Sequence, residues 1–225
     1  MFEKKIVILL FIAVISLLSA CSGGSTSEKI YNHLEKAVTL EEAFEKQQEE
    51  IVKLEKKEQK LYSQIIDLSM EEFDKIKSVS QDAIDTIEKR KELISLEKES
   101  IDASKKEFEE VKDLVGELED EKAKEKANKM YDVMMNRYEA YSKLNQAYTQ
   151  TLDLEKELYT LLQKEDLKQE TLTAHIEKIN QNYNEVLDAN ENFNSYTEKY
   201  NQMKKEFYEA ADLKVKYEDA KQKEK

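Results

Sequence analysis

Residues 87–118, IEKRKELISLEKESIDASKKEFEEVKDLVGEL, decide the fold of this chain. Apolar residues recur there at steps of three, four and seven: Ile87, Ile94, Ile101, Phe108, Val111, Val115 and Leu118. Steps of seven, and of three and four in alternation, match the period of about 3.5 residues found in coiled coils. Most of the remaining residues are charged, so one face of the helix is apolar and the others meet water. The stretch therefore predicts a long amphipathic helix with a narrow apolar seam.

Three further apolar series of the same kind flank this stretch. They run from Ile30 to Leu68, from Met130 to Leu162 and from Leu172 to Leu213. Steps of three, four or seven place each series on one helical face, and short connections make sequential helices antiparallel. The sequence thus predicts an all-α fold, an elongated up-down-up-down four-helix bundle with coiled-coil-like packing over residues 28–225. The helices are expected at about residues 28–66, 70–115, 121–164 and 167–220.

The reversal between the second and third helices has an alternative. Apolar residues thin out after Gly116, and the seam resumes at Met130 in a different phase, which favours a turn within 113–126. A glycine inside a helix costs only about 1 kcal/mol, however. The two helices could therefore also form one continuous helix, and the sequence leaves both possibilities open.

Polar residues interrupt the predicted seams at a few positions. Gln48 and Glu58 stand at seam positions of the first helix, and Asn190 and Thr197 at those of the fourth. Arg137, one of two arginines, is expected to pair with a nearby carboxylate that the sequence does not identify. Polar breaks can also specify self-association, so the oligomeric state stays open.

The composition favours a helical protein over a disordered one. The chain has no proline and keeps 12 tyrosines and 7 phenylalanines, although 38% of its residues are charged. Disordered segments are usually rich in proline and poor in aromatic residues. The net charge of −13 argues against nucleic acid as a partner, because such binding needs lysine and arginine to neutralise phosphates.

The N-terminus has the features of a secretory signal peptide. Lys4 and Lys5 precede an apolar segment, residues 6–18, that is shorter than the roughly 20 residues of a membrane-spanning helix. Small residues follow, as expected before a cleavage site. Residues 1–20 are therefore predicted to be removed, with cleavage between Ala20 and Cys21.

Leu18-Ser19-Ala20-Cys21 looks like a bacterial lipobox, in which the cysteine sulfur receives diacylglycerol and becomes the first mature residue. Cys21 is the only cysteine, and with residues 22–27, which are small and polar, it would form a lipidated, flexible tether. Two or three acyl chains on one residue suffice for stable anchoring. The expected location is the extracytoplasmic face of the cell membrane. Cleavage by the ordinary signal peptidase, with Cys21 unmodified, is the alternative.

No pattern in the sequence points to catalysis or to a metal. The only histidines, His33 and His175, do not have the spacing from glutamate that a di-iron bundle needs. An acylated Cys21 leaves no thiol, and no glycine-rich loop is present to bind phosphate. We expect no enzyme activity, no catalytic residues, no metal and no cofactor besides the covalent lipid on Cys21.

Tyrosine and asparagine are concentrated in the second half of the chain. Ten of the twelve tyrosines lie at or beyond Tyr131. Tyrosine rings stack on sugars and asparagine amides bond to hydroxyls, so one hypothesis is an aromatic binding flank for glycans. Its residues would be Tyr183, Asn190, Asn194, Tyr196 and Tyr200. The alternative is that the tyrosines pack the core, as the seam positions of Tyr138, Tyr141 and Tyr148 suggest.

Four segments of the second half resemble a known family. They are KANKMYDVMMNRYEAY (126–141), LEKELYTLLQKEDL (154–167), HIEKINQNYNEV (175–186) and NENFNSYTEKYN (190–201). Together with the lipobox, these segments resemble the YkyA-type cell-wall-binding lipoproteins of Gram-positive bacteria. The first half of the chain is similar in its apolar pattern more than in its exact residues. The resemblance implies a helical lipoprotein outside the membrane, beneath or within peptidoglycan, and it brings no catalytic residues.

The sequence therefore favours a lipid-anchored helical pillar that binds or spaces cell-wall material, as a structural or adaptor protein. Peptidoglycan is then the expected partner. A second hypothesis is a helical subunit that docks another envelope protein through one long face. A third is a small-ligand carrier whose inner cavity is lined by Tyr138, Tyr141, Tyr183 and Tyr200.

Overall fold

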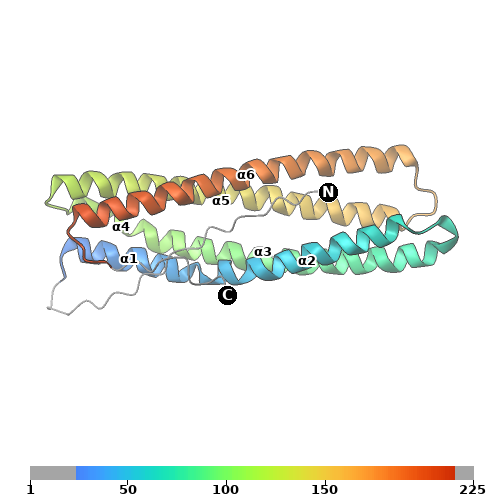
Figure 1. The fold of residues 1–225 in the computed structure, drawn as a ribbon, viewed down its shortest axis with the longest axis horizontal. Coiled ribbons are helices and arrows are strands. Elements are labelled where there is room, and N and C mark those ends of the chain that lie inside the picture. The colour runs from blue at the N-terminus through green and yellow to red at the C-terminus, as the bar shows by residue number, and fades with distance from the viewer. Residues whose placement is uncertain (1–23, 216–225) are drawn as a thin grey trace. The chain divides into compact units, whose positions relative to one another are not determined.

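The structure, a computed structural model, describes residues 24–215, and these residues are almost entirely helical (Figure 1). The elements are α1 (Thr26–Leu40), α2 (Glu42–Ile66), the 3-10 helix η1 (Met70–Glu72), α3 (Phe73–Glu109), α4 (Val111–Gly116), α5 (Glu121–Leu162) and α6 (Gln169–Ala210). No strand occurs between residues 24 and 215. The predicted all-α fold class is confirmed. In this described part, no helix is both long enough and apolar enough to cross a membrane.

Side-chain caps fix where two of the helices begin. The Glu28 backbone N–H donates to the Ser25 hydroxyl (3.2 Å) and the Ser25 N–H donates to the Glu28 carboxylate (2.7 Å), which forms a capping box ahead of α1. At α5 the Asp120 carboxylate accepts the backbone N–H of Ala123 at 2.7 Å. The chain reversal expected within 113–126 lies between Gly116 and Glu121, directly before this cap.

The last helix ends earlier than the sequence suggested. Asp212 adopts a left-handed conformation, with φ of 51°. The Leu213 N–H then donates to the Tyr208 carbonyl (3.0 Å), and the Asp212 N–H to the Glu209 carbonyl (3.4 Å). This pair of bonds is a Schellman motif, which satisfies the final carbonyls and stops α6 at Ala210. Positions 216–220 of the expected helix lie outside the described residues.

The first predicted helix is divided at Glu41. α1 ends at Leu40 and α2 starts at Glu42. The Glu41 N–H still bonds to the carbonyls of Val38 and Thr39, as in a tightened last turn. The Glu41 side chain is 2% exposed, so the break places a carboxylate inside the protein.

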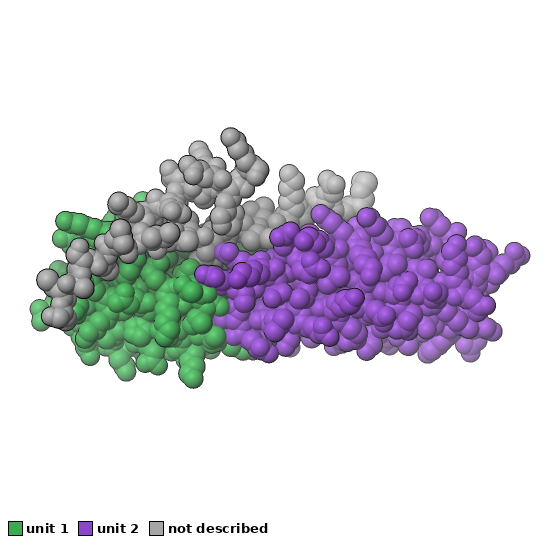
Figure 2. All heavy atoms as spheres, turned by 90° about the horizontal axis from the view of Figure 1, so that it is seen from below, with its two compact units in different colours: residues 1–41, 102–140, 192–225 green, residues 42–101, 141–191 purple. Residues whose placement is uncertain are grey.

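The described chain forms two compact units, coloured separately in Figure 2. Unit 1 contains residues 24–41, 102–140 and 192–215, and unit 2 contains residues 42–101 and 141–191. Each unit is built from four helical segments that come from different parts of the chain.

Unit 1 combines α1, the end of α3 with α4, the start of α5 and the end of α6. Ser104 contacts Tyr138 and Phe108 stacks on Tyr131, so rising numbers in α3 meet falling numbers in α5 and the two helices are antiparallel. The core is mixed aliphatic and aromatic. Its most buried apolar side chains include Ile30, Leu34, Phe108, Met130, Met134, Tyr200 and Phe207.

Unit 2 combines α2, the start of α3, the end of α5 and the start of α6. Neighbouring segments are again antiparallel. In each case rising residue numbers in one segment meet falling numbers in the next. The contacts are Gln48–Glu97 and Glu58–Arg90 between α2 and α3; Lys77–Glu165 and Lys91–Asp153 between α3 and the segment formed by α5 and the residues just after it; and Thr151–Asn182 and Leu154–His175 between α5 and α6. Its apolar cluster draws on α2, α3 and α5, with Ile51, Ile87 and Leu152 among the buried members. The up-down-up-down order of segments is therefore present in this unit.

Candidate functional site

The predicted lipid-attachment residue Cys21 and the cleavage position after Ala20 lie outside the described residues. The described chain begins at Gly24, and α1 begins at Thr26. The helical body therefore starts within five residues of the predicted first mature residue.

The predicted aromatic flank does not form one exposed set. Tyr183 and Asn190 belong to unit 2, whereas Asn194, Tyr196 and Tyr200 belong to unit 1. Tyr183 is 43% exposed, and Asn190, Asn194 and Tyr196 are partly buried. Tyr200 is fully buried, so its ring is not available to a glycan, and its place in the flank was wrong.

The tyrosines of the carrier hypothesis are also divided between the units. Tyr138 and Tyr200 belong to unit 1, and both pack edge-on against Phe108, with ring centroids 6.0 and 6.1 Å away. In unit 2, Tyr141 packs edge-on against Phe44 at 5.9 Å. These rings fill space between helices, as core residues do.

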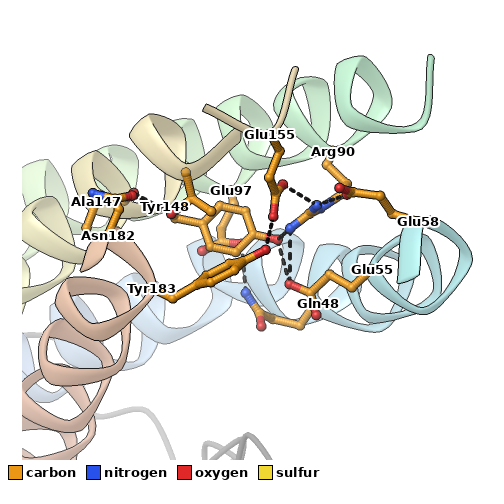
Figure 3. Close-up of polar contacts among 11 residues, drawn as sticks. Gln48, Glu55, Glu58, Arg90, Glu97, Ala147, Tyr148, Glu155, Asn182 and Tyr183 are labelled. Carbon is orange, nitrogen blue, oxygen red and sulfur yellow. Dashed lines mark hydrogen bonds and ion pairs between the residues drawn. The ribbon is translucent and has the colours of Figure 1, made fainter. Parts of the chain in front are cut away.

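The most concentrated group of charged side chains in unit 2 surrounds Arg90 (Figure 3). Its guanidinium, 4% exposed, donates to Glu155 at 2.9 Å, to Glu58 and, at 3.5 Å, to Glu55. It also donates to the Tyr148 hydroxyl at 2.7 Å, and that hydroxyl donates onward to Glu55 at 2.6 Å. One cation from α3 thus binds groups from α2 and α5.

This Arg90 cluster is electrostatically unbalanced, because three carboxylates face one guanidinium. Burial, reinforced by the charge of Glu155, raises the pKa of Glu58 to about 7, against the opposing pull of Arg90. Burial also raises the pKa of Glu155, whose carboxylate accepts a hydrogen bond from Tyr183 of α6. Near neutral pH the cluster therefore takes up a proton, which brings its charges closer to balance.

A second buried carboxyl of unit 2 has only neutral hydrogen-bonding partners. Glu97 is 4% exposed and accepts a hydrogen bond from the Gln48 amide at 2.7 Å (Figure 3), with Tyr141 as its other partner. Burial raises the pKa of Glu97 to about 7.

Unit 1 holds a separate and better balanced ion pair. The Arg137 guanidinium, completely buried, donates to both oxygens of Glu41, at 2.9 and 2.8 Å. Its Nε donates to the Thr197 hydroxyl at 3.0 Å, and Ser104 donates to Glu41 at 2.8 Å. The Ser104 hydroxyl also lies 2.8 Å from that of Tyr138. The carboxylate partner that the sequence left open for Arg137 is Glu41.

Polar interruptions of the predicted seams mark several members of these groups. Glu58 binds Arg90, Gln48 binds Glu97, and Thr197 accepts from Arg137. The convergence on Arg90 was not predicted. The sequence nevertheless contained a hint of it, because Glu58 stands at a seam position and one of the two arginines, Arg90, lies on the next helix.

The histidines bind inside their own units. His33 lies 2.7 Å from Glu107, which also pairs with Lys36, and His175 bonds to the Leu154 carbonyl at 2.8 Å. Across residues 24–215, no three histidine, cysteine, aspartate or glutamate side chains are grouped so as to hold a metal ion. Within each cluster the charged groups bind one another, and the hydroxyls of Ser104 and Tyr148 donate to buried or half-buried carboxylates.

Comparison with known proteins identifies the family. The model of the YkyA family, described as "Putative cell-wall binding lipoprotein", matches residues 25–210. The chain belongs to the YkyA family. That match spans every helix from α1 to α6. The resemblance of the four quoted segments is confirmed, and its two terms, lipoprotein and cell-wall binding, are those of the family description.

A curated relative agrees with this assignment. The chain is 35% identical to "Uncharacterized lipoprotein YkyA" of Bacillus subtilis (strain 168). The alignment spans 206 residues, which are 92% of this chain and 92% of the relative. A solved structure of a conserved protein of unknown function from Staphylococcus aureus is similar in fold, with a TM-score of 0.63. The match covers 83% of this chain and 97% of the Staphylococcus aureus chain. Because the two sequences are only 17% identical, the likeness shows the fold alone.

Proposed function

We propose that this YkyA-family chain is an extracytoplasmic lipoprotein, held to the cell membrane by acyl chains on Cys21, whose helical body binds or spaces cell-wall material without catalysis. The observation that carries this proposal is the family match over residues 25–210, because the family description joins a lipid anchor to wall binding. The lipobox at Leu18–Cys21 supports the anchor independently.

The buried charge clusters support a role without catalysis. A general acid or base must come within hydrogen-bonding reach of its substrate. Glu41 is 2% exposed and Arg137 is completely buried, and in unit 2 Glu155 and Glu58 are 4% and 6% exposed. These groups bind one another between helices, and a substrate outside the protein does not reach them.

Retention on isolated cell walls tests the proposal. The full-length lipoprotein, extracted in a non-ionic detergent, should sediment with purified walls at about 0.15 M salt, where charges more than about 8 Å apart are screened. It should not sediment with cellulose particles of similar size. Absence from the wall pellet, together with an envelope protein that co-purifies in stoichiometric amount, would support the docking hypothesis in place of wall binding.

The same wall-retention assay tests whether Tyr183, a residue of the predicted aromatic flank, contributes to wall binding. Tyr183 is the most exposed of its tyrosines. If stacking of this ring on glycan contributes, Tyr183→Ala should weaken retention while Tyr183→Phe, which keeps the ring, should not. Equal retention of both variants would leave the flank without a role.

A further inference from the structure

The second half of α2 has an unusual surface for an acidic chain. Between residues 52 and 66 its exposed charged side chains are all lysines: Lys53, Lys56, Lys57 and Lys60. The two acidic residues of this stretch, Glu55 and Glu58, turn inward and bind Arg90. The outer face of this half of α2 is therefore cationic, although the whole chain carries a net charge of −13.

Three of these lysines are unpaired. Lys53 pairs with Glu49 and Glu50 one turn earlier. Within the described chain, Lys56, Lys57 and Lys60 make neither an ion pair nor a hydrogen bond, whereas α3 and α5 carry lysine–glutamate pairs one turn apart. Cations can also favour a helix C-terminus, but only within its last turn. The last turn of α2 contains no basic residue, so the helix dipole does not explain them.

Two of these lysines border a shallow, open depression in the surface of α2. The residues that line it are Lys56, Gln59, Lys60, Ser63 and Gln64, which carry ammonium, amide and hydroxyl groups at the ends of their side chains. Residues four apart on a helix are separated by about 6 Å along its axis. Ammonium groups, amides and a hydroxyl thus follow one another along the helix. Such a row fits an extended ligand with repeated anionic groups and many hydroxyls.

The cations of this face are of one type. Lysine binds phosphate as a point charge, whereas the planar arginine fork binds either carboxylate or phosphate in a bidentate manner. Both arginines of the chain are buried, so this surface offers only lysine. Its exposed residues include no aromatic ring on which a base could stack, which disfavours single-stranded nucleic acid.

We propose that this α2 lysine face, formed by Lys56, Lys57, Lys60, Gln59, Ser63 and Gln64, binds a phosphodiester-linked, hydroxyl-rich polymer of the cell wall. The inference rests on the proposed wall binding and names its ligand class. The lysines neutralise successive phosphates, and the amides and the serine hydroxyl bond to the hydroxyls between them.

The test compares two wall preparations and two sets of substitutions in the full-length, detergent-solubilised lipoprotein. One preparation is intact, and the other is treated with cold hydrofluoric acid, which cleaves phosphodiesters and leaves glycan and peptide. The variant K56Q/K57Q/K60Q removes the cations of the face. The control K89Q/K168Q/K178Q removes the same charge from exposed lysines elsewhere in unit 2. Circular dichroism checks that both are folded.

On intact walls, the apparent affinity of K56Q/K57Q/K60Q should fall at least about tenfold, and the plot of log affinity against log salt should flatten by about two, as expected for three lost phosphate contacts. The control should stay within about twofold of the wild type on the same counterion argument. Wild-type binding should be lost on treated walls. K56R/K57R/K60R, which keeps the charges, should retain binding.

The failures of the two proposals can be told apart. Wild-type protein that is retained equally on intact and treated walls overturns the phosphodiester ligand and leaves wall binding in place. Equal loss for both glutamine triples also overturns the lysine face, since net charge alone would then explain the effect. Wild-type protein retained on neither preparation overturns the proposed function and this inference together.

Discussion

Arg137 is a full positive charge placed where water does not reach. Its side chain is completely buried, and its bidentate bonds to Glu41 compensate for the lost hydration. Removing one partner leaves the other charge buried and alone. Arg137→Met should therefore lower the free energy of unfolding by roughly 3–5 kcal/mol, as measured by urea denaturation.

A double variant separates the energy of the interaction between Glu41 and Arg137 from the energies of their other contacts. Glu41→Leu with Arg137→Met removes both charges together, and a buried pair replaced by apolar residues often costs little. The double variant should be more stable than Arg137→Met alone. If instead the two losses simply add, the two residues do not compensate each other and the argument fails.

Glu97 gives the protein a pH dependence of defined sign. Its folded-state pKa is about 7, above its ordinary value of 4.5, because the carboxyl is buried with neutral partners. Between these two values the folded state binds a proton that the unfolded state does not. Stability from this group is therefore full below about pH 4.5 and falls as the pH rises to about 7, by roughly 3 kcal/mol.

Substitution should abolish that slope. Glu97→Gln mimics the protonated carboxyl, so its stability advantage over the wild type should be near zero at pH 4.5 and grow towards pH 8. Urea midpoints across this range measure it. The exposed residue Glu99 provides a matched control, because Glu99→Gln changes the same charge on the same helix without burial. A constant difference between Glu97→Gln and wild type would contradict the assignment.

At the scale of the helices, the periodicity of apolar residues correctly predicted which face of each helix is buried. The seam of Ile87, Ile94 and Ile101 follows from one helical face, and all three side chains are buried in the structure. Spacing within a helix fixes the face of a residue but not its height against a neighbour. For this reason the sequence placed Glu58 on a seam and could not choose Arg90 as its partner.

Helix ends were harder to predict because backbone geometry and distant partners decide them. The stop at Ala210 depends on one left-handed residue, Asp212, which carries no strong sequence signal. The break at Glu41 coincides with an ion pair to a residue far along the chain, Arg137. By contrast, the local cap of Ser25 and Glu28 follows from their spacing of three.

On the scale of the whole molecule, the proposed function depends on where the helical body is held. A single acyl chain binds membranes only marginally, whereas two or more give stable anchoring. Apolar residues 6–18 are fewer than the roughly 20 that a spanning helix needs, so they are a poor substitute for the lipid. The proposed anchor therefore rests on one sulfur atom, that of Cys21.

Cys21→Ser removes that sulfur and should release the protein from the membrane. In cells fed an alkyne-labelled fatty acid, the wild type should carry the label and stay in the membrane pellet after an alkaline carbonate wash. The variant should lose the label and shift mostly to the wash or the medium. Ser22→Ala, one residue along, should behave as the wild type. A Cys21→Ser protein held as firmly as the wild type would mean that something other than lipid anchors the chain, because a serine hydroxyl cannot form the thioether.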